Sequence, residues 1–265
     1  MIVGENTLQR FSKASAGGGW VLACLMALLI AILGPIQGAF AAGKRMETLV
    51  ADRRTEAFDL ESGVLLYRGE TTASQKDGIL SESTIYWDPG GRVLQTIELK
   101  YDFESLRVIR YRLVDPRSGE TETVTASDGR VNLTYKSARD EEEKAESMDW
   151  DAGLICTELI RERIRGTLED MAGGKPLGME LLVPSRLGTV NFQVELEGDT
   201  EESGIAMVVA RAEPAFWLFR MMVAPLRFYY SATPPHQLLE YRGRASVKTD
   251  EGDPLVVRLV YYYDK

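Results

Sequence analysis

The residues that most often carry acid–base, nucleophilic or metal chemistry are scarce in this chain. It holds one histidine, His236, and two cysteines, Cys24 and Cys156. A serine or cysteine nucleophile needs a base beside it, and a zinc site needs about four nitrogen, sulfur or carboxylate ligands. His236 follows two prolines at the start of a predicted strand, a context typical of a surface turn. We therefore predict no catalytic residue, no metal site and no cofactor.

Acidic residues are abundant, with 40 Asp and Glu against 31 Lys and Arg and a net charge of -9. An acidic chain is a poor match for nucleic acid, which is bound through a basic surface. Paired carboxylates can act as general acid and base, but no spacing singles out one pair. The densest acidic run, 140–146, lacks the glycine and the spaced carboxylates of a calcium loop, and it predicts a solvated loop or the approach to a helix.

One segment, 215–224, is apolar on all sides and has Arg220 as its single charged residue. Pro214 and Pro225 flank it, which favours a short helix of about ten residues. Such a helix is either wedged into the core of a curved sheet or forms an adaptable surface, as a lid over a cavity or a docking face. The second interpretation makes this segment and the strand after it a candidate ligand site. The predicted ligand-binding residues are Phe216, Trp217, Phe219, Met221, Met222, Phe228 and Tyr230.

Alternating polar and apolar residues between closely spaced turns predict the elements that would position this site. In the first half, Asp-Gly and Pro-Gly turns separate segments whose apolar residues fall on one face, as in an antiparallel sheet with one solvated side. The predicted strands of this half lie near 63–71, 79–87, 93–102, 106–114, 120–126 and 131–138.

Apolar residues near the 3.6-residue period predict a central helix over 152–171, ended by Gly173 and Gly174. Cys156 would be buried and inert on its apolar face. Strands follow near 178–183, 188–197, 204–212, 225–232, 237–248 and 255–263. The predicted fold class is α+β, mostly antiparallel: a curved open sheet or open barrel of about 11–12 strands, with one central helix and the short apolar helix.

The N-terminus has the layout of a secretory signal. Basic residues precede an apolar run over 20–33, a Gly-Pro break and Ala39-Phe40-Ala41. We predict a signal peptide over 1–41 and a single β-rich domain over 42–265, in the periplasm or otherwise exported. The alternative is an uncleaved inner-membrane anchor over 20–41, the only membrane contact that the sequence suggests. The apolar run is shorter than the roughly 20 residues of a spanning helix.

The C-terminal half resembles a family of exported, uncharacterised bacterial β-rich proteins. The positions that carry the resemblance are Pro225, Phe228, Tyr230, Leu238, Leu239, Tyr241, Gly243, Val257 and Tyr262. More loosely, the order of signal peptide, strands, helix and strands is similar to lipoprotein carriers of the LolA/LolB type. That similarity implies an open β-barrel plugged by helices, and it concerns architecture rather than a site.

These patterns together predict an exported, non-enzymatic protein that binds or carries a lipid or other apolar small molecule. The alternative is a structural or interaction subunit of an envelope assembly, which would bind its protein partner through 215–224. A second alternative is an enzyme with a carboxylate site.

Overall fold

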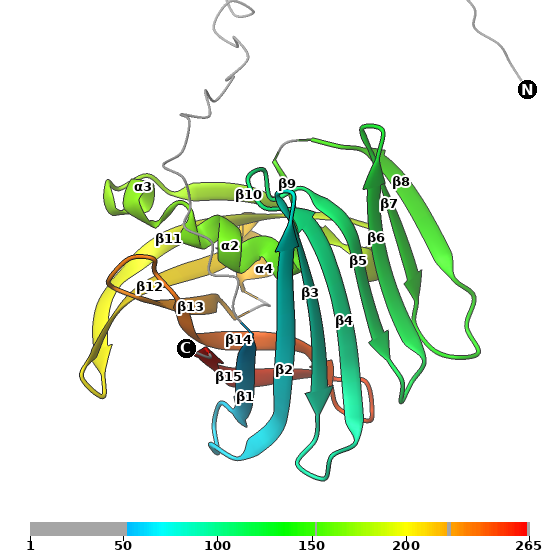
Figure 1. The fold of residues 1–265 in the computed structure, drawn as a ribbon, viewed down its shortest axis with the longest axis horizontal. Helices are drawn as coiled ribbons and strands as arrows, with labels where there is room; N and C mark the ends of the chain where they lie inside the picture. The colour runs from blue at the N-terminus through cyan, green and yellow to red at the C-terminus, as the bar shows by residue number, and fades with distance from the viewer. Residues whose placement is uncertain (1–51, 152, 222–223, 264–265) are drawn as a thin grey trace, which may run out of the picture. The chain divides into compact units, whose positions relative to one another are not determined.

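The computed structural model describes residues 52–151, 153–221 and 224–263, so the predicted signal peptide lies outside the described residues. The described residues contain fifteen strands in a single sheet (Figure 1). The first eight are β1 Arg53–Asp59, β2 Leu65–Lys76, β3 Ile79–Trp87, β4 Val93–Asp102, β5 Val108–Asp115, β6 Glu120–Ser127, β7 Arg130–Lys136 and β8 Lys144–Asp149. The other seven are β9 Leu154–Cys156, β10 Leu177–Val183, β11 Gly188–Glu202, β12 Ile205–Pro214, β13 Leu226–Ser231, β14 Leu238–Lys248 and β15 Pro254–Tyr263.

The first and last strands meet in the middle of this sheet. The order runs from β8 down to β1, then from β15 down to β9. Arg53 of β1 pairs with Tyr263 of β15, whereas β8 and β9 form the two edges. Neighbouring strands are antiparallel except β9 and β10, which are parallel. The predicted mostly antiparallel open sheet is therefore confirmed, and among the described residues no pairing closes it between β8 and β9.

Each predicted strand has a counterpart, but the predicted number of strands was too low. The three additional strands are β1, β8 and β9. The first half of β8 was expected to belong to the charged loop or helix approach over 140–146. It pairs with β7 on one side only, and its side chains are largely exposed. An edge strand tolerates such charges because neither of its faces has to enter the core.

The predicted central helix was wrong in its start and in its continuity. Its first residues form β9, in which Cys156 keeps an extended backbone. A short helical segment follows, as η1 Thr157–Leu159 and α2 Ile160–Arg165. The helix then breaks at Gly166 and Thr167, and a separate turn, α3, covers Leu168–Ala172. The Thr167 hydroxyl donates to two carbonyls of the preceding turn, which favours ending the helix there.

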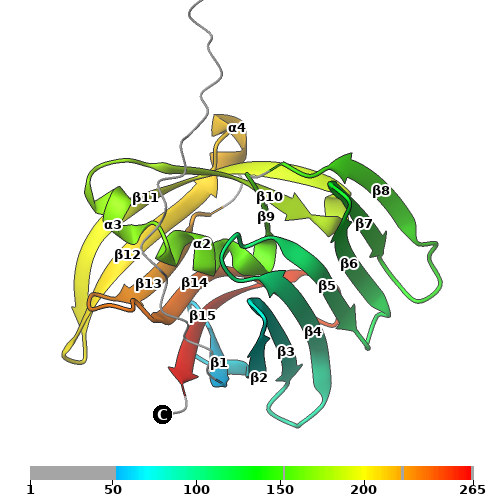
Figure 2. The ribbon, with the colours of Figure 1, turned by 45° about the horizontal axis from the view of Figure 1, so that its top comes forward.

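The core lies on the concave side of the sheet, where α2 is enclosed (Figure 2). Leu159, Ile160 and Ile164 are buried there against side chains from both halves of the chain. Cys156 belongs to the same core, and burial raises the pKa of its thiol to about 12. The prediction that Cys156 is buried is confirmed, although the residue lies on a strand rather than on a helix.

The short apolar helix is also smaller than predicted, because α4 covers only Trp217–Arg220. Its neighbourhood is exposed, so the interpretation as a helix wedged into the core was wrong. Within the described part of the chain, no helix has the length and apolarity to cross a membrane.

Candidate functional site

A cavity of about 440 Å³ lies inside the curved sheet. Its walls come from strands of both halves of the sheet and from the segments around α2 and η2, Pro184–Arg186. Its volume falls within the range of small-molecule sites. The aliphatic and phenylalanine lining consists of Ile97, Leu99, Leu113, Ile160, Leu181, Val183, Leu226, Phe228, Leu238, Val257 and Leu259. Five tyrosines also line it: Tyr67, Tyr86, Tyr111, Tyr241 and Tyr261.

Two glycines make room for tyrosines on this wall. Gly69 lies between Thr55 and Tyr86 on neighbouring strands, and a Cβ there would come within 2.5 Å of both side chains. A Cβ on Gly243 would lie 2.7 Å from the Tyr241 hydroxyl. Each tyrosine thus occupies the space that a side chain on its glycine would need. Aromatic rings commonly cover strand glycines in this way.

The cavity tyrosines are neutral phenols. Burial raises the pKa values of Tyr67 and Tyr111 well above the ordinary value for tyrosine. Burial also raises the pKa values of Tyr86, Tyr241 and Tyr261. These rings therefore supply apolar surface and π-faces without adding negative charge.

One carboxylate of the cavity wall, Glu82 of β3, forms ion pairs with two arginines. Arg53 reaches it at 2.8 Å and Arg161 of α2 at 2.5 Å. Burial alone would raise the pKa of Glu82, but the two guanidinium groups outweigh it and hold the pKa at about 2. Tyr230 donates its hydroxyl to the Arg161 carbonyl at 2.7 Å. These contacts fix α2 against β1, β3 and β13.

Three further carboxylates line the same cavity, and within the described part of the chain only one has a close cation. The Lys248 ammonium lies 2.6 and 2.7 Å from the two oxygens of Glu120. Glu122 receives a hydrogen bond from the neutral Tyr111 hydroxyl at 3.4 Å. Burial, then the neighbouring Glu120, raise the pKa of Glu122 to about 7. Burial also raises the pKa of Glu158, whose ion pair with Arg161 is long at 3.9 Å.

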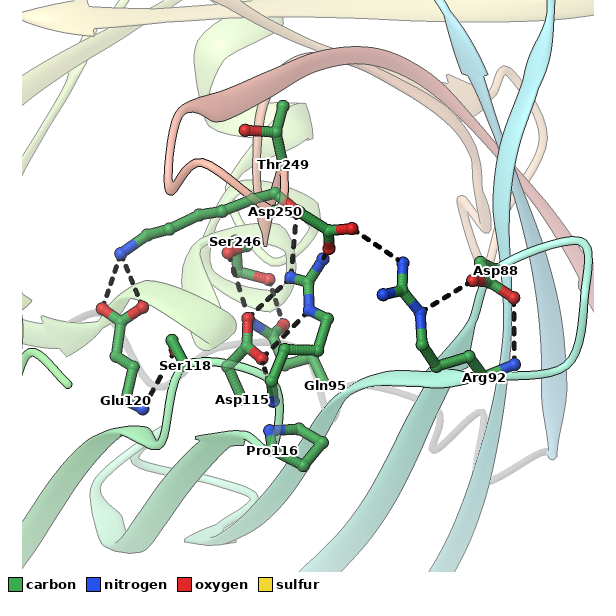
Figure 3. A network of polar contacts seen from close by, with 12 residues as sticks. Asp88, Arg92, Gln95, Asp115, Pro116, Ser118, Glu120, Ser246, Thr249 and Asp250 are labelled. Atoms are coloured by element: carbon green, nitrogen blue, oxygen red, sulfur yellow. Dashed lines mark hydrogen bonds and ion pairs between the residues drawn. The ribbon is translucent and has the colours of Figure 1, made fainter. Parts of the chain in front are cut away.

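A polar bridge, defined here as the contacts of Ser246, Lys248 and Asp250, lies beside the cavity, which Ser246 and Lys248 also line (Figure 3). Ser246 and Gln95 exchange two hydrogen bonds, at 2.7 and 3.1 Å. Asp250 accepts from two arginines in different turns, Arg92 at 3.1 Å and Arg117 at 3.0 Å. The bridge therefore ties the β14–β15 hairpin to β4, β5 and β6 in the other half of the sheet.

The register of this hairpin explains how it reaches so far. Arg244 pairs with Val256, whereas Lys248 pairs with Pro254, so β14 carries extra residues at this point. An insertion of this kind bends a strand and increases its twist. The tip of the hairpin contacts the turn before β4, through Arg92, and the turn after β5, through Arg117.

The predicted ligand-binding residues do not come together. Phe216, Trp217 and Met221 lie at the surface with 52%, 63% and 68% of their areas exposed. Phe228 is buried and lines the cavity, and Tyr230 is buried beside α2. Met222 lies outside the described residues, and Phe219 is placed only by its backbone in α4. The prediction of one joint site therefore separates into an interior part and a surface part.

The sequence analysis missed the cavity glutamates. Glu120, Glu122 and Val124 alternate with threonines in β6, and Val124 is fully buried. Residues of equal parity in a strand share a face, so the position of Val124 could have placed both glutamates inside.

The single histidine lies away from these groups. His236 is in the β13–β14 turn, where its Nδ1 is 2.9 Å from the Ser231 carbonyl oxygen. In the described ranges, no group of three or more His, Cys, Asp or Glu side chains is placed to hold a metal ion.

No family model and no curated protein matches the chain. One solved structure that it is similar to is a beta-barrel-like protein of domain of unknown function DUF1849 from Brucella abortus. The match has 12% identity and a TM-score of 0.46, and it covers 82% of this chain and 97% of that chain.

Proposed function

We propose that this protein is an exported binder or carrier of a mostly apolar small molecule, such as a lipid, and that the cavity inside its sheet is the binding site. The cavity of about 440 Å³ carries this proposal. Apolar walls with a few converging polar groups are the usual composition of a small-molecule site. Export is supported by the signal layout of residues 1–41.

The cavity differs from the ligand site expected from the sequence. Among the described residues of 215–224, none lines it. Its walls are mostly paired strands, which the Glu82 ion pairs and the polar bridge connect to other parts of the sheet and to α2. A site on such elements keeps its shape without a ligand, which lowers the entropic cost of binding.

A cavity-filling substitution tests the proposal. We expect the full-length protein to bind the neutral fluorescent probe Nile red, and Val183→Trp to weaken that binding about tenfold or more. Val183 lines the cavity, and an indole in its place would occupy ligand volume. The matched control is Val256→Trp, which adds the same ring at an exposed position outside the cavity lining.

The expected result is unchanged affinity in the control and loss in the cavity variant, with equal melting temperatures. Absence of binding by the unmodified protein, or equal binding by both variants, would overturn the proposal. Solvent extraction of protein recovered from an envelope fraction, followed by mass spectrometry, should also release a bound apolar molecule.

A second candidate function is that of an interaction subunit in an envelope assembly. It is favoured by the exposed group of Phe216, Trp217, Leu218 and Met221 around α4. Exposed aromatic and methionine side chains at one place are typical of binding surfaces. Trp217→Ala should then abolish a crosslink to an envelope protein while Nile red binding and thermal stability remain unchanged. Loss of Nile red binding in this variant would instead link the surface to the cavity.

A further inference from the structure

Two carboxylates of the cavity wall, Glu122 and Glu158, lack a close cation among the residues that the structure describes. Glu82 and Glu120 each have a close cation, as described above. Glu122 has the neutral Tyr111 hydroxyl, and the long contact of Glu158 is to a guanidinium that also binds Glu82 and Glu162. A carboxylate removed from water is costly unless a cation accompanies it. A positively charged group of a ligand would therefore be stabilised beside these two carboxylates.

The two carboxylates lie in the same part of the cavity. Both raise the pKa of the Tyr111 hydroxyl, and Glu158 adds to the rise in the pKa of Glu122. Neither is fully buried, although both line the cavity, so their oxygens remain accessible to a ligand there. A cation placed beside Tyr111 would interact with both.

The tyrosines provide a second attraction for a cation. Five neutral tyrosine rings line this one cavity. The face of an aromatic ring attracts an ammonium group, and desolvation strengthens that attraction. Carboxylates together with aromatic rings form the usual site for organic ammonium ions, whereas a calcium ion takes six to eight oxygen ligands.

We infer that the ligand of this cavity is an amphiphile with a cationic nitrogen, which lies between Glu122 and Glu158 beside Tyr111. The apolar body of the ligand packs against the aliphatic part of the wall. This inference rests on the proposed function and specifies the chemical class of its ligand. A metal ion alone would leave the aliphatic surface unoccupied, and an anionic amphiphile would add a third negative charge to an unmatched pair.

Displacement of Nile red by four probes with the same octyl chain tests the inference. The probes are octyltrimethylammonium, octanol and octyl sulfate, and octylamine serves as a primary-amine version of the cation. We expect both cations to displace Nile red at concentrations at least about tenfold below octanol, and octyl sulfate to be the weakest. A preference for octyltrimethylammonium over octylamine would identify the head group as quaternary, and the reverse would identify it as a primary amine.

Charge-removing variants locate the cation. Glu122→Gln and Glu158→Gln keep the shape of each side chain and should each weaken octyltrimethylammonium binding about tenfold, while octanol and Nile red binding stay within about twofold. The matched control, Glu98→Gln, removes an exposed carboxylate that does not line the cavity and should change nothing. Two independent variants are used so that misfolding of one does not remove the test.

The outcomes separate this inference from the proposed function. Nile red binding with no preference for the cation, or a preference that survives both variants, overturns the inference and leaves the cavity as a binding site. Failure of Nile red and all octyl probes to bind overturns both.

Discussion

Glu82 of β3 and Glu122 of β6 line the same cavity, yet their pKa values are shifted in opposite directions from the ordinary value for glutamate. The pKa of Glu82 is held at about 2, whereas the pKa of Glu122 is raised to about 7. Burial raises both values, so burial does not explain the difference. Two guanidinium groups reach Glu82, while Glu122 has a phenol and a neighbouring carboxylate. The comparison shows that two cations connect Glu82 to β1 and α2, whereas Glu122 of the same cavity has no close cation among the described residues.

The largest effect should come from removing one of the two cations that pair with Glu82. Arg161→Met leaves Glu82 with Arg53 alone and removes a partner of Glu162, in a part of the core where all these side chains are largely buried. Losing one member of a buried ion pair typically costs about 3–5 kcal/mol. We expect a loss of this size in the free energy of unfolding, measured by urea denaturation.

The control for Arg161→Met is Arg68→Met, which removes an exposed ion pair to Glu56. Exposed pairs contribute about 1 kcal/mol or less, so this variant should unfold almost like the unmodified protein. Equal losses in the two variants would show that the interior pairing does not hold α2.

A smaller effect is expected from Lys248→Met. This variant removes the cation beside Glu120, which would then lack a close cation as Glu122 does. The ammonium is partly exposed, so we expect a loss of about 1–2 kcal/mol in the free energy of unfolding. Lys248 also lowers the pKa of Glu122, so the pKa of that carboxyl should rise further in the variant. Carboxyl titration by nuclear magnetic resonance measures this rise, and a fall would contradict the assigned geometry.

The most direct test of the comparison is the pH dependence of stability. Glu122 binds its proton more tightly in the folded state, so ionising it costs stability as the pH rises from the ordinary 4.5 to about 7. Glu122→Gln should therefore gain stability relative to the unmodified protein over that interval and keep the gain above it. Melting temperatures across the interval measure this.

Glu82→Gln should show the opposite sign. The low pKa of Glu82 stabilises the folded protein above the ordinary 4.5, and this contribution is lost as the pH falls toward about 2. The stability deficit of Glu82→Gln should thus shrink in acid. If both variants shifted stability in the same direction with pH, the assignment of the two environments would be wrong.

Alternation along the chain was sufficient to predict most strands but not the edges or the helix. In β4, Ile97, Leu99 and Tyr101 alternate with polar residues, and all three are buried as predicted. At the edge strand β8 no face is buried, so its sequence carries no alternating signal. The helix was overextended because Leu154 and Ile155 fit its apolar period, while pairing with β10 determines their extended backbone.

The candidate site was harder to predict because position, rather than composition, decides what a side chain contacts. The apolar segment near α4 was assigned either to the core or to the surface, as a lid over a cavity or a docking face. It leaves the sheet after Pro214, and its described large apolar side chains are exposed. Conversely, Glu122 and Glu158 are of a residue type typical of a solvated surface, yet both line the cavity. Of the predicted ligand-binding side chains that the structure describes, only Phe228 of β13 lines the cavity.

The meeting of β1 and β15 in the middle of the sheet has a consequence for how the chain is connected. If the chain were circularly permuted to begin at β9 and end at β8, with β15 joined to β1, the order of strands along the chain would match their order across the sheet. Arg53 and Tyr263 are paired neighbours, so a short hairpin loop would suffice for the new joint. The new ends would fall at the two outer strands, where few contacts are interrupted. In topology, the described strands from β10 through β15 and β1 to β8 form an antiparallel meander, in which the first and last strands of the chain lie side by side at the centre.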